Sequence, residues 1–389
     1  MTPWESVFLF VAAIPFIYYS IALYSSWRFF RVADLRRALN DRFAPPVSNL
    51  KPVRGLDPET YQNFASYCRQ DYPEYEVIFC TGGPDDPAVP VIRKLMEDFP
   101  ACRIRLIFSD GHTAANDKVA KLRRLVEEAK YEILVINDAD VRVEPGYLRS
   151  VVAPLENPNI GAVTCMYVST QETNLIERLQ TIGMISDFYP GLLVAWQLDG
   201  VKFALGQTIV TTRSRIRNFG GYEILENRPA DDLLVGRLVA EQGCEVVLLP
   251  YAVNTVPDFE SLHGFWDKRT RWMTVMRCMR PWGHVGLIFT FGLPWSLAAI
   301  AVRPEVAVAV AYLGAYAAFR CAMTYLVGVR GLKQTGLWKR MLLIPLWDAT
   351  AFAIWLASFF RRSVRWRGVQ YHIRDGKLIL AHSSARRTF

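Results

Sequence analysis

Hydrophobic and polar positions divide the chain into an apolar segment at its start, an alternating middle and further apolar blocks near its end. Residues 6–27 carry no charge. A helix of about 22 residues rises about 33 Å, which is enough to cross a bilayer. We therefore predict a transmembrane helix over residues 1–30 and a basic linker over residues 31–46. The positive-inside rule then places the following domain in the cytoplasm.

The middle of the chain alternates between short apolar runs and helical periodicity. Strands are predicted at residues 75–80, 104–108, 133–136, 160–168, 208–212 and 246–249. Helices are predicted between several of them, at residues 58–69, 88–98, 115–129 and 231–242. This alternation favours a mostly parallel sheet with helices on both faces. We therefore expect an α/β domain over residues 47–262.

Three apolar blocks follow, at residues 281–302, 306–329 and 341–360. The second block contains Arg320 and the third contains Asp348. Charges inside a membrane are costly unless they are paired or face a polar cavity. In an antiparallel helix pair, the two residues would lie about 15 Å and 12 Å from the connecting loop. We therefore predict a contact between Arg320 and Asp348.

The first of these blocks is interrupted by Gly283, Gly286, Gly292 and Pro294. If all three blocks crossed the membrane, the basic tail over residues 362–389 would lie outside, against the positive-inside rule. Within the membrane helices predicted over residues 283–361, we therefore prefer a re-entrant or interfacial helix for this block. The segment before it, residues 263–282, is basic and aromatic and is predicted to be an interfacial helix.

Composition and charge agree with an integral membrane protein. The chain is 51% hydrophobic, and 45 Lys and Arg residues exceed 37 Asp and Glu residues. The basic residues flank the apolar blocks, as on the headgroup-facing side of a membrane protein, so nucleic acid is not an expected partner. The seven cysteines show no metal-ligand spacing and no Cys-x-x-Cys. Zinc and disulfide chemistry are therefore not expected.

Two aspartates stand at the end of a predicted strand, in the stretch ILVINDAD at residues 133–140. The carboxyl ends of strands are where open α/β sheets bind ligands. There Asp138 and Asp140 could converge on one divalent cation, Mg²⁺ or Mn²⁺, which would neutralise a diphosphate. The alternative is a turn or a helix cap, which is the commoner role of this pattern.

Several motifs follow one another in order between residues 47 and 280. They are VSNLKPVRGLDPETYQNFASYCRQDYPEYEVIFC at 47–80, DDPA at 85–88, NDKV at 116–119, DADVRV at 138–143, GG at 220–221, ADD at 230–232 and RW at 271–272. With these motifs the chain resembles the ceramide glucosyltransferase family, which is similar in turn to the hopanoid-lipid glycosyltransferases of bacteria.

The resemblance implies a Rossmann-like GT-A fold that transfers a sugar from a nucleotide donor to a membrane lipid with inversion. UDP-glucose is the expected donor and ceramide the expected acceptor, with a hopanoid or diacylglycerol as the alternative. A processive polysaccharide synthase would need a transmembrane channel, for which the predicted spans are too few. The alternative of another class is a catalytically inactive lipid-binding scaffold, suggested by Gly83 and Lys268, where the sequence departs from the family.

The resemblance assigns donor binding to side chains from four motifs: Lys51, Asp85, Asp86, Asn116, Lys118 and Asp138. The family usually carries a further carboxylate where Gly83 stands, so Asp85 or Asp86 would take over that contact. The alternative role for one of these two aspartates is to cap the next helix. For Asn116 and Lys118 the alternative is a solvated helix start.

The resemblance also assigns the metal to Asp138 and Asp140 and the general base to Asp232. Direct inversion needs one carboxylate that removes the proton of the attacking hydroxyl group. The alternative is that Asp231 and Asp232 cap the helix over residues 231–242 and complement its dipole. Both roles are compatible if Asp231 caps the helix and Asp232 points into the cleft.

Lys268, Arg271 and Trp272 match the family's Gln/Arg-x-x-Arg-Trp motif, where they would contact the departing diphosphate and the acceptor. Residues 268 and 271 share one face of a helix because they lie three positions apart. A lysine at the first position lacks the planar fork of arginine. The alternative is that the whole segment is only a basic interfacial helix.

Overall fold

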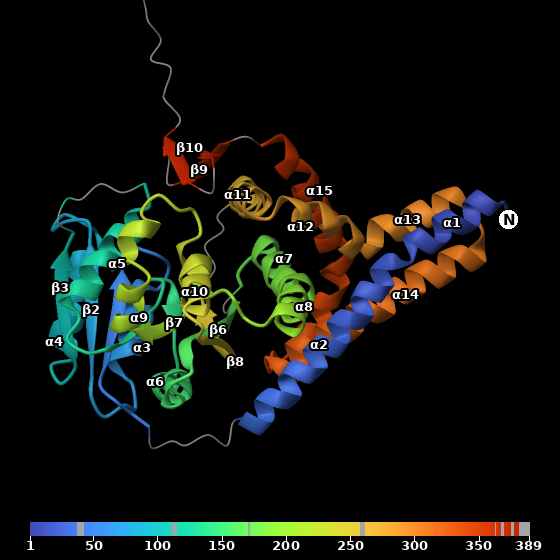
Figure 1. The fold of residues 1–389 in the computed structure, drawn as a ribbon. Helices are drawn as coiled ribbons and strands as arrows, with labels where there is room; N and C mark the ends of the chain where they lie inside the picture. The colour runs from blue at the N-terminus through green and yellow to red at the C-terminus, as the bar shows by residue number, and fades with distance from the viewer. Residues whose placement is uncertain are drawn as a thin grey trace, which may run out of the picture.

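The computed structural model describes residues 1–36, 43–109, 111, 115–169, 172–256, 261–361, 363–366, 369–374 and 377–380. It consists of an α/β domain, a bundle of apolar helices and a small C-terminal sheet (Figure 1). The predicted basic linker lies partly outside the described residues. Its first part is helical, because the first long helix continues to Arg36.

An eight-stranded sheet forms the centre of the α/β domain, in the order β3-β2-β1-β4-β7-β6-β8-β5. Neighbouring strands from β3 to β4 are parallel, as are β6 and β8. Strand β7 pairs antiparallel with β4 and β6, and β5 pairs antiparallel with β8. The mostly parallel sheet predicted from the sequence is thus confirmed. The strands are β1 (Val47–Pro52), β2 (Tyr75–Thr81), β3 (Arg103–Phe108), β4 (Ile133–Ile136), β5 (Val141–Arg142), β6 (Ile160–Ser169), β7 (Ile209–Thr212) and β8 (Glu245–Thr255).

Helices cover both faces of the sheet, as predicted. Successive side chains of a strand point to opposite faces, so Val77 and Phe79 of β2 enter one hydrophobic core while Ile78 and Cys80 enter the other. The helices packed on the first core include α3 (Thr60–Cys68), α4 (Ala88–Asp98) and α6 (Tyr147–Val152). Those on the second include α5 (Asp117–Glu128), α9 (Arg213–Asn218) and α10 (Asp231–Glu241).

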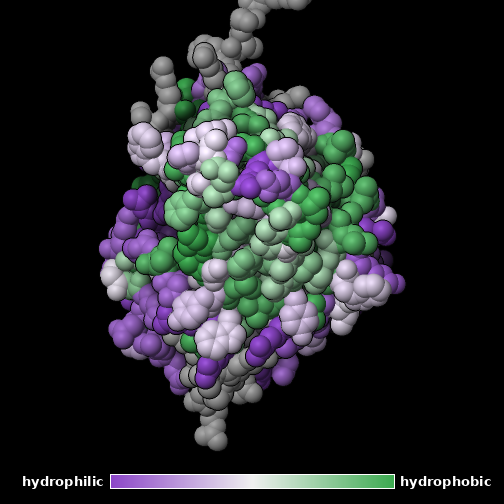
Figure 2. Space-filling model, turned by 90° about the vertical axis from the view of Figure 1, so that its right-hand side faces the viewer, coloured by the Kyte–Doolittle hydropathy of each residue, from purple (hydrophilic) through white to green (hydrophobic). Residues whose placement is uncertain are grey.

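Apolar helices form the part of the molecule opposite the sheet. Among the described residues, three helices are long and apolar enough to cross a membrane, over residues 3–32, 306–331 and 337–360. The helices over residues 281–302 are bent by 57° at Phe291, as a broken span or a re-entrant loop would be. The elements are α1 (Pro3–Ala12), α2 (Ile14–Arg36), α12 (Pro281–Gly286), α13 (Gly292–Val302), α14 (Val306–Thr324) and α15 (Ile344–Phe360). Figure 2 shows this end of the molecule, where hydrophobic residues cover most of the middle.

The bundle and the α/β domain meet at α7 (Leu175–Gly183) and α8 (Tyr189–Asp199), which are joined by a π-helical turn and lie between β6 and β7 in the chain. The predicted Arg320–Asp348 contact is confirmed here, with Arg320 Nε 3.0 Å from Asp348 Oδ2. Arg320 Nη1 also donates to the carbonyl oxygen of Ser186 in the π-helical turn. One buried ion pair thus connects α14, α15 and the α/β domain.

The C-terminal tail, predicted only as a basic segment, contains an antiparallel sheet of β9 (Ser363–Trp366), β10 (Val369–Arg374) and β11 (Lys377–Leu380). The Leu378 amide donates to the Asn227 carbonyl oxygen at 2.7 Å. The Tyr371 hydroxyl group donates to the Ala115 carbonyl oxygen at 3.4 Å. The described strands of the tail therefore lie against the α/β domain.

Candidate active site

The predicted site residues begin to converge where β4 ends. Asp138 and Asp140 follow this strand, and Lys118 stands in the first turn of α5. The Lys118 ammonium group lies 2.6 Å from Asp138 Oδ1 and 3.6 Å from Asp231 Oδ2. Because Asp231 begins α10, this lysine connects two motifs that lie about a hundred residues apart in the chain. The donor-binding role assigned to Lys118 stays a prediction.

Asp232 lies near Asp138 and Lys118, and all three side chains lie beside Gly206. The Gly206 amide donates to Asp232 Oδ2 at 3.1 Å. A Cβ atom on Gly206 would lie 3.0 Å from Asp138 Oδ2, 3.1 Å from Asp232 Oδ2 and 3.3 Å from Lys118 Nζ. These three groups therefore surround one glycine, and a side chain at this position would contact all three tightly. Sequence analysis missed Gly206, since a single glycine before a strand carries no distinguishing signal.

Asp231 does not cap α10, contrary to the alternative role considered for it. The N-cap position is Ala230, which makes no capping hydrogen bond, and the first-turn amide of Leu233 donates to Asp232 Oδ1 rather than to Asp231. Instead Asp231 Oδ1 accepts a hydrogen bond from Asn116 Nδ2 at 3.0 Å. The same amide nitrogen donates to the Arg228 carbonyl oxygen at 3.3 Å. Buried Asn116 thus fastens the start of α5 to the loop before α10.

Lys51 lies at the end of β1, beneath the two aspartates that follow β4. Its ammonium group donates to the Asp138 carbonyl oxygen at 2.7 Å and lies 3.8 Å from the centre of the Tyr67 ring. Burial lowers the pKa of Lys51 to about 7, although Asp140 and Asp138 oppose the shift. Lys51 therefore holds the backbone of the turn that presents Asp138 and Asp140.

Asp138, Asp140, Asp231, Asp232 and Lys118 form the crevice at this edge of the sheet. Two of its carboxyl groups hold their protons more strongly than usual. Burial raises the pKa of Asp140 to about 6, with a further increase from Asp138 and partial relief from Lys268 and Lys51. Burial likewise raises the pKa of Asp232 to about 6, with Asp231 adding to the increase and Lys118 opposing it. Burial is the larger cause in both cases and a neighbouring carboxylate adds to it, so a cation bound at this place would stabilise the ionised forms.

Asp85 and Asp86 lie on the loop between β2 and α4. Asp86 Oδ1 accepts hydrogen bonds from the Gly55 amide and the Ala88 amide, each at 3.0 Å. Asp86 therefore connects the loop after β1 to the start of α4, as expected for a local capping residue. Asp85 is exposed to solvent. The donor-binding role of these two residues stays a prediction.

The predicted diphosphate and acceptor residues lie on α11 (Leu262–Met279), which is helical as expected. The Lys268 charge acts on Asp140, so this ammonium group lies on the crevice side, 5.9 Å from the centre of the Trp272 ring. Arg271 is half-buried. A further arginine that sequence analysis missed, Arg269, lies over the same Trp272 ring at 5.1 Å and donates to Gln180 Oε1 at 2.6 Å.

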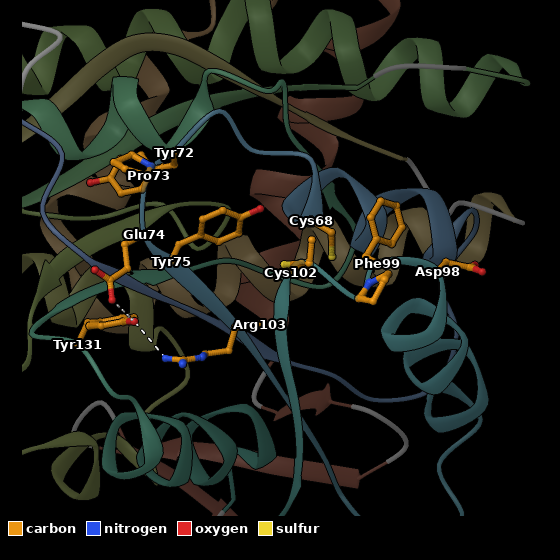
Figure 3. A pocket seen from close by; sticks show the side chains of 12 residues that line it. Cys68, Tyr72, Pro73, Glu74, Tyr75, Asp98, Phe99, Cys102, Arg103 and Tyr131 are labelled. Atoms are coloured by element: carbon orange, nitrogen blue, oxygen red, sulfur yellow. Dashed lines mark hydrogen bonds between the residues drawn. The ribbon is translucent and has the colours of Figure 1, made fainter.

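The pocket in Figure 3 is a different place. Its walls include Glu74, Arg103 and Tyr131, which stand at the amino ends of β2, β3 and β4. The Tyr131 hydroxyl group donates to Glu74 Oε1 at 2.8 Å and accepts from Arg103 Nη1 at 3.3 Å. Asp138 stands at the opposite, carboxyl end of β4. This pocket therefore plays no part in the crevice described above.

The sheet, its helices and the carboxylates at its carboxyl edge define a GT-A glycosyltransferase. The solved structure of the mannosyltransferase PcManGT from Pyrobaculum calidifontis matches the fold with a TM-score of 0.53 and 18% identity, covering 90% of this chain and 99% of that chain. At this identity the likeness concerns the fold alone.

The chain belongs to glycosyl transferase family 21, whose model matches residues 7–379. Ceramide glucosyltransferase 1 of Caenorhabditis elegans is 22% identical over 296 residues, which cover 73% of this chain and 62% of that protein. The chain thus spans less than two thirds of this relative. A ceramide glucosyltransferase of Gibberella zeae is 34% identical over 146 residues, which cover 35% of this chain and 28% of that protein. The resemblance noted in the sequence is confirmed.

Proposed function

We propose that this glycosyltransferase moves glucose from UDP-glucose to the hydroxyl group of a membrane lipid, with ceramide as the acceptor, and forms a β-glycosyl lipid by inversion. The names of the relatives support the sugar and the lipid. The observation that carries the chemistry is the convergence of Asp232, Asp138 and Lys118 around Gly206. A base, a site for a cation and an ammonium group for a diphosphate are the parts that inverting transfer needs.

Asp232 acts as the general base in this proposal. The Gly206 amide holds its Oδ2 atom at 3.1 Å and the Leu233 amide holds its Oδ1 atom at 2.8 Å. These bonds fix the carboxylate while each oxygen keeps a free lone pair. With a pKa near 6, the group is ionised at neutral pH and still basic enough to take a proton from the attacking hydroxyl group.

Asp138 and Asp140 would hold a divalent cation, Mg²⁺ or Mn²⁺. Among the described residues, no group of three or more His, Cys, Asp or Glu side chains could hold a metal by itself. That agrees with a Mg²⁺-type site, in which one or two carboxylates share the ion with substrate phosphates and water. When bound, the ion would neutralise the diphosphate leaving group. The solved mannosyltransferase was obtained with Mn²⁺.

Lys118 and the α11 residues would bind the rest of the donor. Lys118 contacts Asp138, and the charge of Lys268 acts on Asp140. Two ammonium groups so placed would stabilise the charge that develops on the departing diphosphate. Arg271 and Trp272 would guide the lipid from the bundle. The basic residues at the end of α2 support a cytoplasmic α/β domain.

The test uses the purified full-length chain with radiolabelled UDP-glucose and ceramide, diacylglycerol or a hopanoid as separate acceptors. We expect a labelled lipid with ceramide, no product with EDTA, and recovery on adding Mn²⁺ or Mg²⁺. Product with only another acceptor would correct the lipid assignment. No product from any acceptor or sugar nucleotide, with the nucleotide still bound, would favour the lipid-binding scaffold.

A further inference from the structure

A second polar site lies at the opposite side of the α/β domain from the tail, where α2 and α14 leave the bundle. A pocket there has walls from three segments: Trp27, Phe30 and Arg31 of α2, Pro250 of β8, and Arg330 and Lys333 beyond the end of α14. The apolar spans over residues 3–32 and 306–331 end at this place. The pocket therefore lies at the boundary between the bundle and the α/β domain, where lipid headgroups meet a membrane protein.

Local backbone features hold the three segments together. A Cβ atom on Gly331 would lie 2.2 Å from the Phe30 ring, so only glycine permits this approach of the two helices. Lys333 adopts a left-handed conformation with φ of 57°, which is uncommon for a residue with a side chain. The chain therefore turns sharply enough after the π-helical end of α14 to bring Lys333 back to the pocket.

The third wall depends on a bulge in β8. Opposite consecutive residues of β6, the register of β8 moves from Leu249 to Ala252, so the strand bulges at Pro250. Bulges bend a strand and move the extra residues out of the ladder. Pro250 is tolerated there because its missing amide leaves no ladder bond unmade. The bulge thus carries Pro250 to the wall of the pocket.

Charge and polarity define what the pocket could hold. In the part of the chain that the structure describes, no acidic residue lines it, whereas Arg31, Arg330 and Lys333 contribute three cations. The Arg31 guanidinium group lies 5.1 Å from the centre of the Trp27 ring. Trp27, Phe30 and Leu326 supply an apolar wall. Three like charges around one pocket repel one another unless an anion lies between them.

We propose that this pocket binds the phosphate group of an anionic phospholipid from the membrane. Arginine guanidinium groups and a lysine ammonium group are the side chains that bind phosphate, and basic pockets between membrane helices take lipid headgroups. The aromatic wall would lie against the glycerol and the first acyl carbons. A lipid held there would fasten β8 to α2 and α14. The inference does not depend on which sugar or acceptor the enzyme uses.

The experiment compares the full-length protein in nanodiscs of phosphatidylcholine alone and of phosphatidylcholine with phosphatidylglycerol. Lipid retention is measured by native mass spectrometry and the unfolding temperature by light scattering. Each cation near an anionic headgroup contributes about 1 kcal/mol, so three should favour phosphatidylglycerol about a hundredfold. We expect R31Q/R330Q/K333Q to lose both this preference and the rise in unfolding temperature that binding causes.

Two matched variants make the result specific. R28Q/R280Q/K339Q removes the same charge from other exposed positions near the bundle and should keep the preference. R31K/R330K/K333R keeps the charge in the pocket and should retain most of it. Equal retention of phosphatidylglycerol by the wild type and R31Q/R330Q/K333Q would overturn the site. Stabilisation by inorganic phosphate, without any preference between nanodiscs, would overturn the assignment to a lipid headgroup.

Discussion

The crevice and the junction with the bundle both bury charged side chains, but they differ in how completely those charges are neutralised. At the junction, Asp348 accepts hydrogen bonds from Arg320 and from the Tyr316 hydroxyl group, the latter at 2.7 Å. Arg320 donates two further hydrogen bonds to Ser186. In the crevice, Asp138 and Asp231 share one ammonium group, that of Lys118, and Asp232 accepts hydrogen bonds from two backbone amides.

The difference separates a structural role from a binding role. A buried ion pair whose charged atoms already make hydrogen bonds has little capacity left for a ligand. Removing one partner leaves the other charge buried and unpaired. A carboxylate pair that lacks enough positive charge costs stability until a cation or a proton binds. The junction therefore holds the two parts of the molecule together, while the crevice is poised to bind metal and substrate. Each prediction below tests one side of this comparison.

The largest effect is expected for Asp232→Asn. An amide cannot accept the proton of the attacking hydroxyl group, so kcat should fall by about a hundredfold or more, while nucleotide binding stays within about twofold of wild type. A transfer assay measures kcat, and a nucleotide titration measures nucleotide binding. The matched control is Asp98→Asn, a carboxylate that accepts a hydrogen bond from Tyr61 away from the crevice. Unchanged turnover in Asp232→Asn would mean that another group is the base.

The next largest effect is expected at the junction. Arg320→Gln leaves Asp348 without its cation and should lower the free energy of unfolding by about 3–5 kcal/mol. Thermal unfolding in detergent measures the change. Arg303→Gln, which breaks the surface pair of Arg303 with Glu305, should leave the stability nearly unchanged, because solvent screens such a pair.

An apolar replacement of the pair sharpens the same test. R320M/D348L removes both charges and should recover most of the stability lost in Arg320→Gln, because neither partner is left unpaired. If the double variant were as unstable as the single one, the contribution would come from other contacts of Arg320, such as those with Ser186, rather than from the ion pair.

A smaller effect is expected for Gly206→Ala. The added Cβ atom would meet Asp138, Asp232 and Lys118 at 3.0–3.3 Å. These side chains must shift by a few tenths of an ångström, so we expect kcat to fall about tenfold with little loss of stability. Gly146→Ala is the matched control, since its Cβ atom would meet nothing within 4 Å. Equal activity of both variants would show that the three groups need not stay at their observed positions.

Sequence patterns predicted the elements whose apolar residues recur regularly and missed those that depend on partners elsewhere. Strand β1 was missed because it contains Ser48, Asn49 and Lys51, all buried. Their polar groups find partners only in the folded chain, as when Ser48 Oγ donates to Glu76 Oε1 at 2.6 Å. Strand β8 was predicted to end before Pro250, which the bulge accommodates.

The site was predictable to the extent that single residues carry its chemistry. Asp138, Asp140 and Asp232 were singled out by the family resemblance, since a carboxylate at the end of a strand or the start of a helix is more often a turn or cap residue. Gly206 and the Asn116–Asp231 bond were not predictable, since they arise from segments that meet only in three dimensions. The Arg320–Asp348 pair was predictable because buried membrane charges must find each other.

The smallest effect concerns the pH dependence of stability without metal. The ordinary pKa of Asp140 is 3.8 and its folded value is about 6, so between these values the folded protein binds more protons than the unfolded chain. Stability therefore falls as pH rises from about 4 to 6. Asp140→Asn removes this loss and should stabilise the metal-free protein by about 1 kcal/mol above pH 6, because the side chain keeps some contact with solvent.

Unfolding in EDTA at pH 4.5 and 7.5 measures this difference. Asp140→Asn and the wild type should nearly coincide at the lower pH and separate at the higher one, and added Mn²⁺ should restore only the wild type. Asp98→Asn should follow the wild type throughout. If Asp140→Asn were instead less stable at pH 7.5 in EDTA, its carboxylate would already be neutralised by local partners, as Asp348 is, and the distinction between the two clusters would fail.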